Sequence, residues 1–240
     1  MMKKNKSIIT IDGPSYVGKS TIAKELSNLL DFTYINTGHM YRSVAKFGIE
    51  NNISNKDAGS IVEIAEKLNI EFKYFKKNTR TFVNNVDLTE SLHYPEIVSY
   101  SSKIAQIPQL RKKLNQMQYD YAKKGNVIFE GRDLGTVVFP DAKWKFYITA
   151  SLKVRAMRMK KNLIKRDSSK KINYIELIPK VSDLDERDTK RKIAPLKKAD
   201  DAIVYDNSDS PTEKQDAIVL QYYINNADEI IANNSILLNK

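Results

Sequence analysis

The sequence contains no cysteine. This absence excludes disulfide bonds and thiolate chemistry, and it is typical of a protein that works in the cytoplasm, which is where we expect this one. The sequence also has no apolar run long enough to span a bilayer. The first residues, Met1–Lys6, are basic, but the apolar stretch that follows them is short. We therefore expect neither a secretory signal nor a membrane anchor.

Acidic residues are also in short supply. The chain has 40 Lys and Arg against 29 Asp and Glu, which gives a formal net charge of +11. Such an excess indicates either a pocket for an anionic small molecule or a surface for nucleic acid. The basic residues are spread along the chain rather than gathered in one block. This spread favours a phosphate site together with an ordinary solvated surface over a surface for nucleic acid. With 240 residues, 41% of them hydrophobic, the chain can form one full core with inserted subdomains.

The most specific signal is a match to the P-loop pattern G-x-x-x-x-G-K-[ST]. The apolar run before it predicts a buried parallel strand, and apolar residues at helical spacing follow it. Its glycines allow several backbone N–H groups to converge on one phosphate, and the helix N-terminus adds positive potential. We predict nucleoside triphosphate binding by Gly13, Pro14, Ser15, Tyr16, Val17, Gly18, Lys19, Ser20 and Thr21.

Two side chains of this loop have predicted roles of their own. Lys19 supplies a cation for the β- and γ-phosphates, and the Ser20 hydroxyl is placed to bind Mg²⁺. A second acidic anchor comes later, because Glu130 ends the apolar run 126–130. A carboxylate at the end of a strand beside the P-loop strand is suited to hold the same metal or its water.

The rest of the chain alternates predicted strands and helices. A short helix is expected after the segment 36–42, ending near Phe47 and Gly48, with that glycine as its C-cap. The stretch 70–88 alternates apolar and polar residues and predicts a small antiparallel insertion, with a hairpin that turns at Asn84 and Asn85. Prolines predict helix starts at Pro95 and Pro108. Further strands are expected at 32–35, 126–130, 144–148 and 202–206.

Three motifs carry a resemblance to one family. Asn36-Thr37-Gly38 followed by Met40-Tyr41-Arg42, the segment Gly131-Arg132-Asp133-Leu134-Gly135-Thr136, and Asp188 to Leu196 each resemble a motif of bacterial cytidylate kinases. The resemblance covers most of residues 7–222. Each motif alone is weak apart from the P-loop, but their combination is specific.

The resemblance implies particular roles for residues of this chain. It implies that ATP and Mg²⁺ are used, and that the substrates are the small molecules CMP and dCMP. The residues implied to bind the monophosphate are Thr37, Tyr41, Arg42, Ser102, Arg111, Arg132, Asp133, Asp188 and Arg191. The cations implied to surround the transferred phosphate are Lys19, Arg132, Arg155, Arg158 and Arg191. Mg²⁺ would lie by Ser20 and Glu130.

The chain also departs from the family pattern at several positions. Glu130 stands where the family usually has Asp, so its contact with the metal is expected to be direct or through water. Leu184 replaces an arginine that contacts the sugar, which leaves the preference between ribose and deoxyribose open. His93 replaces an arginine, and we expect it to be a surface histidine. One arginine of the lid pattern is also missing, at Met159.

We therefore predict an α/β protein with the three-layer fold of P-loop nucleoside monophosphate kinases, an inserted small antiparallel sheet and a helical lid. The expected parts are a core (1–36, 125–152 and 193–225), a monophosphate-binding domain (37–124), a lid (153–192) and a tail (226–240). We expect a monomer that binds neither nucleic acid nor membrane. Two alternatives stay open: a kinase for UMP, AMP or an unrelated acceptor, and a P-loop protein that uses its charge to bind nucleic acid.

Overall fold

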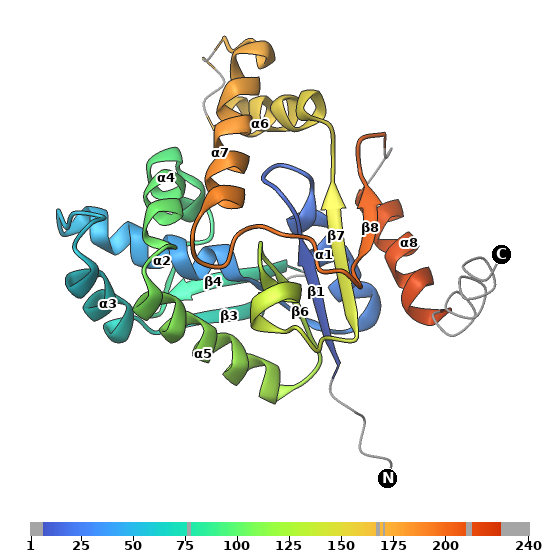
Figure 1. Ribbon diagram of the computed structural model, residues 1–240, viewed down its shortest axis with the longest axis horizontal. Helices are drawn as coiled ribbons and strands as arrows, with labels where there is room; N and C mark the ends of the chain where they lie inside the picture. Colours follow the sequence, from blue (N-terminus) through green and yellow to red (C-terminus); the bar gives the residue numbers. More distant parts are fainter. Residues whose placement is uncertain (1–6, 76–77, 167–168, 170, 210–212, 227–240) are drawn as a thin grey trace.

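The computed structural model describes residues 7–75, 78–166, 169, 171–209 and 213–226. Its centre is a five-stranded sheet in the order β2-β6-β1-β7-β8, in which all neighbours are parallel (Figure 1). The strands are β1 (Ile8–Asp12), β2 (Thr33–Asn36), β6 (Val127–Glu130), β7 (Trp144–Thr149) and β8 (Ile203–Asp206). The predicted parallel sheet is confirmed, and the carboxyl ends of its strands share one edge.

Helices cover both faces of the sheet. Ile9 and Ile11 of β1 pack in a cluster with residues of α1 and α8, whereas Phe129 of β6 packs in a second cluster with residues of four other helices. The helices of the first cluster are α1 (Lys19–Leu30) and α8 (Glu213–Asn225). The helices of the second cluster are α2 (Thr37–Glu50), α3 (Ala58–Lys67), α4 (Pro95–Ile104) and α5 (Pro108–Lys124). The inner strands β1 and β6 are mostly apolar because both of their faces are buried.

A small antiparallel sheet lies between α3 and α4 in the chain. It contains β3 (Ile70–Phe75), β4 (Asn78–Val83) and β5 (Val86–Asp87). The turn between β4 and β5 is formed by Asn84 and Asn85, both with positive φ, as the tightest hairpins require. The predicted insertion and its turn are thus confirmed. The Tyr74 hydroxyl donates to Asn28 Oδ1 at 3.1 Å, which joins the insertion to α1.

The expected end of a helix at Gly48 is wrong, because α2 continues to Glu50. Gly48 lies inside the helix, where a Cβ would come within 2.8 Å of the Tyr100 hydroxyl of α4. That hydroxyl donates to the carbonyl oxygen of Ile53 at 2.7 Å. The glycine therefore allows two helices to approach each other and does not serve as a C-cap.

The segment 153–192, which we call the lid, forms its own helical unit beyond the carboxyl ends of β1 and β7 (Figure 1). It consists of α6 (Leu152–Arg166), η3 (Tyr174–Leu177) and α7 (Ile178–Lys190). Ala156, Leu177 and Val181 form a small buried core between these elements. The lid is therefore a packed unit despite its high charge.

Within the described residues, no helix combines the length and apolar composition needed to cross a membrane. One expectation concerns residues outside the described ranges. The tail assigned to 226–240 is described only at Asn226.

Candidate active site

The P-loop connects β1 to α1 at the carboxyl edge of the sheet. Gly13 has φ of +146°, and a Cβ there would lie 2.2 Å from the carbonyl oxygen of Ile148. Lys19 is 4% exposed, and its Nζ donates to the carbonyl oxygen of Pro14 at 2.6 Å. Burial, followed by the charge of Arg132, lowers the pKa of Lys19 well below its usual range. A bound anion would favour the charged form of this lysine.

Glu130 lies at the end of β6, next to the P-loop. One carboxylate oxygen accepts a hydrogen bond from the Ser20 hydroxyl at 2.9 Å. The other accepts from the Tyr34 hydroxyl and from Asn36 Nδ2, the latter at 2.9 Å. Burial, together with the charge of Glu130, raises the pKa of Tyr34 well above its usual range, so the phenol stays a donor. The longer side chain of Glu130 thus still reaches the predicted metal-binding hydroxyl.

The loop after β6 is held to β1 by Asp12. This carboxylate is 5% exposed and accepts the backbone N–H groups of Leu134 at 3.1 Å and Gly135 at 2.8 Å. These residues begin the π-helical turn η2 (Leu134–Val138). Asp12 therefore fixes the position of the adjoining Arg132 and Asp133 relative to the P-loop.

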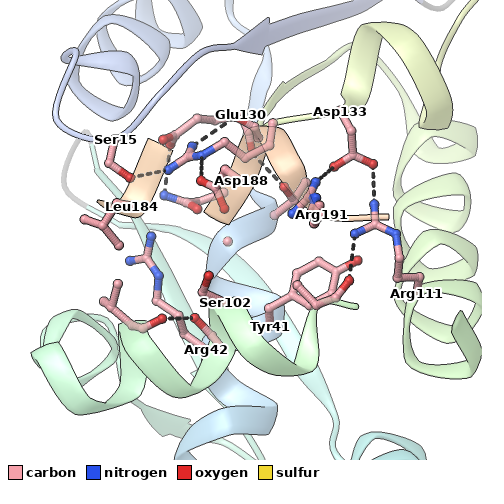
Figure 2. Close-up of a pocket in the computed structure, with 18 residues that line it drawn as sticks. Ser15, Tyr41, Arg42, Ser102, Arg111, Glu130, Asp133, Leu184, Asp188 and Arg191 are labelled. Atoms are coloured by element: carbon pink, nitrogen blue, oxygen red, sulfur yellow. Dashed lines mark hydrogen bonds and ion pairs between the residues drawn. The ribbon is translucent and has the colours of Figure 1, made fainter. Parts of the chain in front are cut away.

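Asp133 lies between two guanidinium groups (Figure 2). One carboxylate oxygen accepts from Arg111 Nη2 and the other from Arg191 Nη2, the latter at 3.0 Å. All three side chains are at most 10% exposed. The Arg111 guanidinium also lies 5.7 Å from the ring centre of Tyr41, whose pKa burial raises to about 12. Arg111, Asp133 and Arg191 therefore form a buried cluster in which positive and negative charges alternate.

Arg132 joins the P-loop to the lid. Its Nε donates to Asp188 Oδ2 of α7 at 2.9 Å, and its Nη2 donates to the Ser15 hydroxyl at 2.9 Å. Leu184 lies one helical turn before Asp188 and lines the same cavity (Figure 2). That wall of the cavity therefore presents one carboxylate and one apolar side chain.

Arg42, on α2, marks the opposite side of the cavity. Its Nη1 lies 3.2 Å from Nδ1 of His93, which belongs to the short turn η1 (Ser91–His93). The His93 ring also packs edge-on against His39 at 5.0 Å between centroids. The expectation that His93 is a surface histidine is wrong, because it is half-buried against Arg42 and His39. Burial lowers the pKa of His39 well below its usual range, so this ring is neutral.

Two adjoining cavities bring these groups together. The first is lined by all nine residues that the resemblance implies for the monophosphate: Thr37, Tyr41, Arg42, Ser102, Arg111, Arg132, Asp133, Asp188 and Arg191. The second, of ≈ 770 Å³, contains P-loop residues Lys19, Ser20 and Thr21. Five of the described residues line both cavities, the charged Arg42, Glu130 and Arg132 and the apolar Val98 and Leu184. Ligands in the two cavities would therefore meet beside the three charged side chains.

The two predicted lid arginines differ in placement. Arg158 lines the second cavity and donates to the carbonyl oxygens of Val17 at 3.0 Å and Asn207 at 2.9 Å. Arg155 is 5% exposed and pairs with Asp185 of α7 at 2.6 Å. In the described part of the chain, Arg155 is not among the residues that line either cavity. Its charge is directed to the lid and to the P-loop backbone.

Sequence reasoning missed Asp12, Tyr34 and Asn36. Each is a polar residue at or near the carboxyl end of a parallel strand, and this position is the signal that would have found them. Asn36 stands directly opposite Glu130 in the sheet register. The described residues contain no group of three or more His, Cys, Asp or Glu that could hold a metal by themselves. A cation here would depend on Glu130, Ser20 and the oxygens of a ligand.

The comparisons with known proteins agree with this geometry. A family profile described as cytidylate kinase matches residues 9–225. The cytidylate kinase of Carboxydothermus hydrogenoformans is 38% identical over 213 residues, which cover 89% of this chain and 95% of that protein. The cytidylate kinase of Clostridium botulinum is 41% identical over 206 residues, 86% of this chain and 92% of that protein. That of Oceanobacillus iheyensis is 37% identical over 216 residues, 90% and 93% of the two chains. The three-layer fold is that of the P-loop nucleoside monophosphate kinases, and the chain belongs to the cytidylate kinase family.

Proposed function

We propose that the protein transfers the terminal phosphate of ATP to CMP and dCMP, giving ADP and the nucleoside diphosphates. The observation that carries this proposal is the junction of the two cavities at Arg42, Glu130 and Arg132. A donor in the P-loop cavity and an acceptor in the other would bring their phosphates together there. Proximity and cations supply most of the catalysis of such a transfer.

The base is proposed to bind at Asp133. A cytosine ring offers a carbonyl oxygen, a ring nitrogen and an amino group in one plane, and the amino group needs an acceptor. Asp133 is the carboxylate of this end of the cavity, and the neighbouring Arg111 and Ser102 supply donors for the carbonyl and the ring nitrogen. Uracil has a carbonyl in place of the amino group, so it would face the carboxylate with an acceptor. This mismatch favours cytosine.

The phosphates are proposed to bind among cations from different elements. Arg42 and Arg132 would hold the acceptor phosphate, while Lys19 contacts the donor phosphates. Arg191 and the lid arginines Arg155 and Arg158 would add charge around the transferred group as it moves in line between the two nucleotides. The acceptor oxygen already carries negative charge, so the reaction requires no general base.

A magnesium ion is proposed to accompany ATP. Hydroxyl and carboxylate oxygens are the ligands that Mg²⁺ prefers, and the Ser20 hydroxyl lies 2.9 Å from Glu130 Oε1. When bound, the ion would neutralise charge on the donor phosphates. Glu130 would act directly or through water, with Tyr34 and Asn36 fixing its orientation.

The sugar is proposed to meet Asp188 and Leu184. Leu184 has no polar atom to offer a 2′-hydroxyl, and Asp188 can keep its pair with Arg132 where that hydroxyl is missing. Loss of the 2′-hydroxyl would therefore leave no buried group unsatisfied on the Leu184 side, which supports the use of both CMP and dCMP.

The proposed divisions of the chain are the core, the monophosphate-binding domain (37–124) and the lid (153–192). Movement of the monophosphate-binding domain, and of the acceptor-side end of the lid at Asp188 and Arg191, over the transferred phosphate would exclude water from it and limit ATP hydrolysis.

The proposal is tested by measuring ADP release with ATP, Mg²⁺ and one acceptor at a time: CMP, dCMP, UMP or AMP. We expect CMP and dCMP to be phosphorylated with similar kcat/KM and far faster than the other two. Arg42→Gln should raise the KM for CMP, whereas Lys67→Gln, a charge change on exposed α3, should not. A preference for UMP or AMP would favour another kinase. Failure with every monophosphate, together with salt-dependent DNA or RNA binding, would favour the nucleic-acid alternative.

A further inference from the structure

Tyr16 has an unfavourable backbone conformation in the middle of the P-loop. Its φ is +63°. In the described residues, six non-glycine residues have positive φ, and four of them are Asn or Asp, which tolerate this region. A bulky tyrosine does not, so it keeps such a conformation only where its surroundings hold it.

The side chain of Tyr16 packs against the lid. It is partly buried against the small core formed by Ala156, Leu177 and Val181, beside Met159 and other apolar lid residues. Tyr16 is thus the member of this cluster that comes from the P-loop. The cluster that it packs against contains residues of all three helical elements of the lid, α6, η3 and α7.

The residues on either side of Tyr16 contact the lid as well. Arg155 Nη1 donates to the carbonyl oxygen of Ser15 at 3.3 Å, and Arg158 Nη1 donates to that of Val17 at 3.0 Å. Three consecutive P-loop residues therefore hold one face of α6. The two arginines that make these contacts are those proposed to add charge around the transferred phosphate.

A second set of lid contacts lies on the acceptor side and differs in kind. There, Asp188 pairs with Arg132, and Arg191 pairs with Asp133. An acceptor nucleotide would need these same polar groups, so such contacts would be exchanged when it binds. The contacts at Tyr16 involve an apolar cluster and backbone carbonyls, and they can persist throughout the reaction.

We propose that Tyr16 is a positioning residue that anchors the lid to the P-loop and so holds Arg155 and Arg158 against the backbone of that loop, with Arg158 at the wall of the donor cavity. Tyr16 acts through the lid rather than on the reacting atoms. Its left-handed backbone is the conformation that directs the ring out of the loop and into the lid core. The kinetic part of this inference rests on the proposed function, whereas the structural part does not.

The test compares Tyr16→Gly and Tyr16→Asn, which suit a left-handed backbone but lack the ring, with Tyr16→Phe, which keeps the ring. Tyr222→Ala, at an exposed tyrosine of α8, is the matched control. Backbone hydrogen exchange is measured without nucleotides for α6 and α7, with β3 and β4 as the internal reference. We expect faster exchange of the lid in the Gly and Asn variants only, and normal exchange in the Phe and control variants.

Kinetics provide the second readout. In the Gly and Asn variants we expect kcat to fall roughly tenfold to a hundredfold, as for a displaced catalytic group, with little change in the KM for CMP. Tyr16→Phe should restore the normal rate. Unchanged lid exchange in Tyr16→Gly, or a Phe variant as impaired as the Gly variant, would overturn the inference. If even the unmodified protein phosphorylates no monophosphate, the proposed function fails, while the exchange experiment still decides whether Tyr16 anchors the lid.

Discussion

Asp133→Asn removes one negative charge from between the guanidinium groups of Arg111 and Arg191 and leaves the side-chain volume almost unchanged. The carboxylate is buried, with a side chain 10% exposed, and each of its oxygens accepts from one arginine. In the variant, one oxygen is replaced by an NH₂ group that can only donate. One arginine therefore loses its acceptor, and the base loses its proposed carboxylate partner.

The size of the effect follows from these contacts. A hydrogen bond to a charged group contributes about 1.5–3 kcal/mol, which corresponds to a factor of roughly 10–150 in binding or rate. We expect kcat/KM for CMP to fall by about this factor. The kcat/KM for UMP should fall much less, because the new amide can donate to the uracil carbonyl. Breaking a buried ion pair typically costs roughly 3–5 kcal/mol, so the free energy of unfolding should fall as well.

The assay is ADP release with CMP and with UMP, together with urea unfolding of the same samples. Asp120→Asn, at an exposed residue of α5, serves as the control and should change neither quantity. The decisive quantity is the ratio of the two kcat/KM values, since it cancels any general loss of active protein. An equal fall for CMP and UMP would refute the assignment of Asp133 to the base. A full rate with CMP would refute it too.

Three further predictions concern other parts of the site and the fold. Glu130→Gln should raise the Mg²⁺ concentration for half-maximal rate roughly 10- to 100-fold, as a magnesium titration would show; an unchanged titration would exclude Glu130 from the metal site. Burial raises the pKa of Asp12 to about 6, so its ionisation lowers the free energy of unfolding as pH rises from about 4 to 6, by up to roughly 3 kcal/mol. Asp12→Asn should lack this component in urea unfolding across that range, and identical pH slopes would contradict the raised pKa. Gly48→Ala should lower the free energy of unfolding by about 1–3 kcal/mol, because the added Cβ would collide with Tyr100. Thermal unfolding should show no such loss for the control Gly59→Ala, where the nearest atom lies 3.7 Å from the added Cβ.

Features that depend on residues close together in the chain could be predicted from the sequence. The P-loop was recognisable because its glycines, Lys19 and Ser20 act within a few residues of one another, between a buried strand and a helix. The turn at Asn84 and Asn85 was predictable for the same reason, since both residues tolerate positive φ. Gly48 shows the limit of this reasoning. A glycine near the end of a helical pattern is typical of a C-cap, and only the position of Tyr100 reveals that it serves close packing instead.

Motif resemblance selected the residues that line the first cavity, but it did not indicate which charges pair with which. Asp133 meets Arg111 from 22 residues away and Arg191 from 58 residues away. Glu130 meets Tyr34 and Asn36 because β2 lies beside β6, although 96 and 94 residues separate them in the chain. Such pairs depend on strand order and helix placement, which are set by burial of the whole core rather than by any local pattern. The sequence by itself therefore determined which chemical groups the protein has for binding phosphates. The tertiary structure alone decided that Asp133 is held between two arginines, that Asp12 positions the loop beside it, and that Tyr16 packs into the lid.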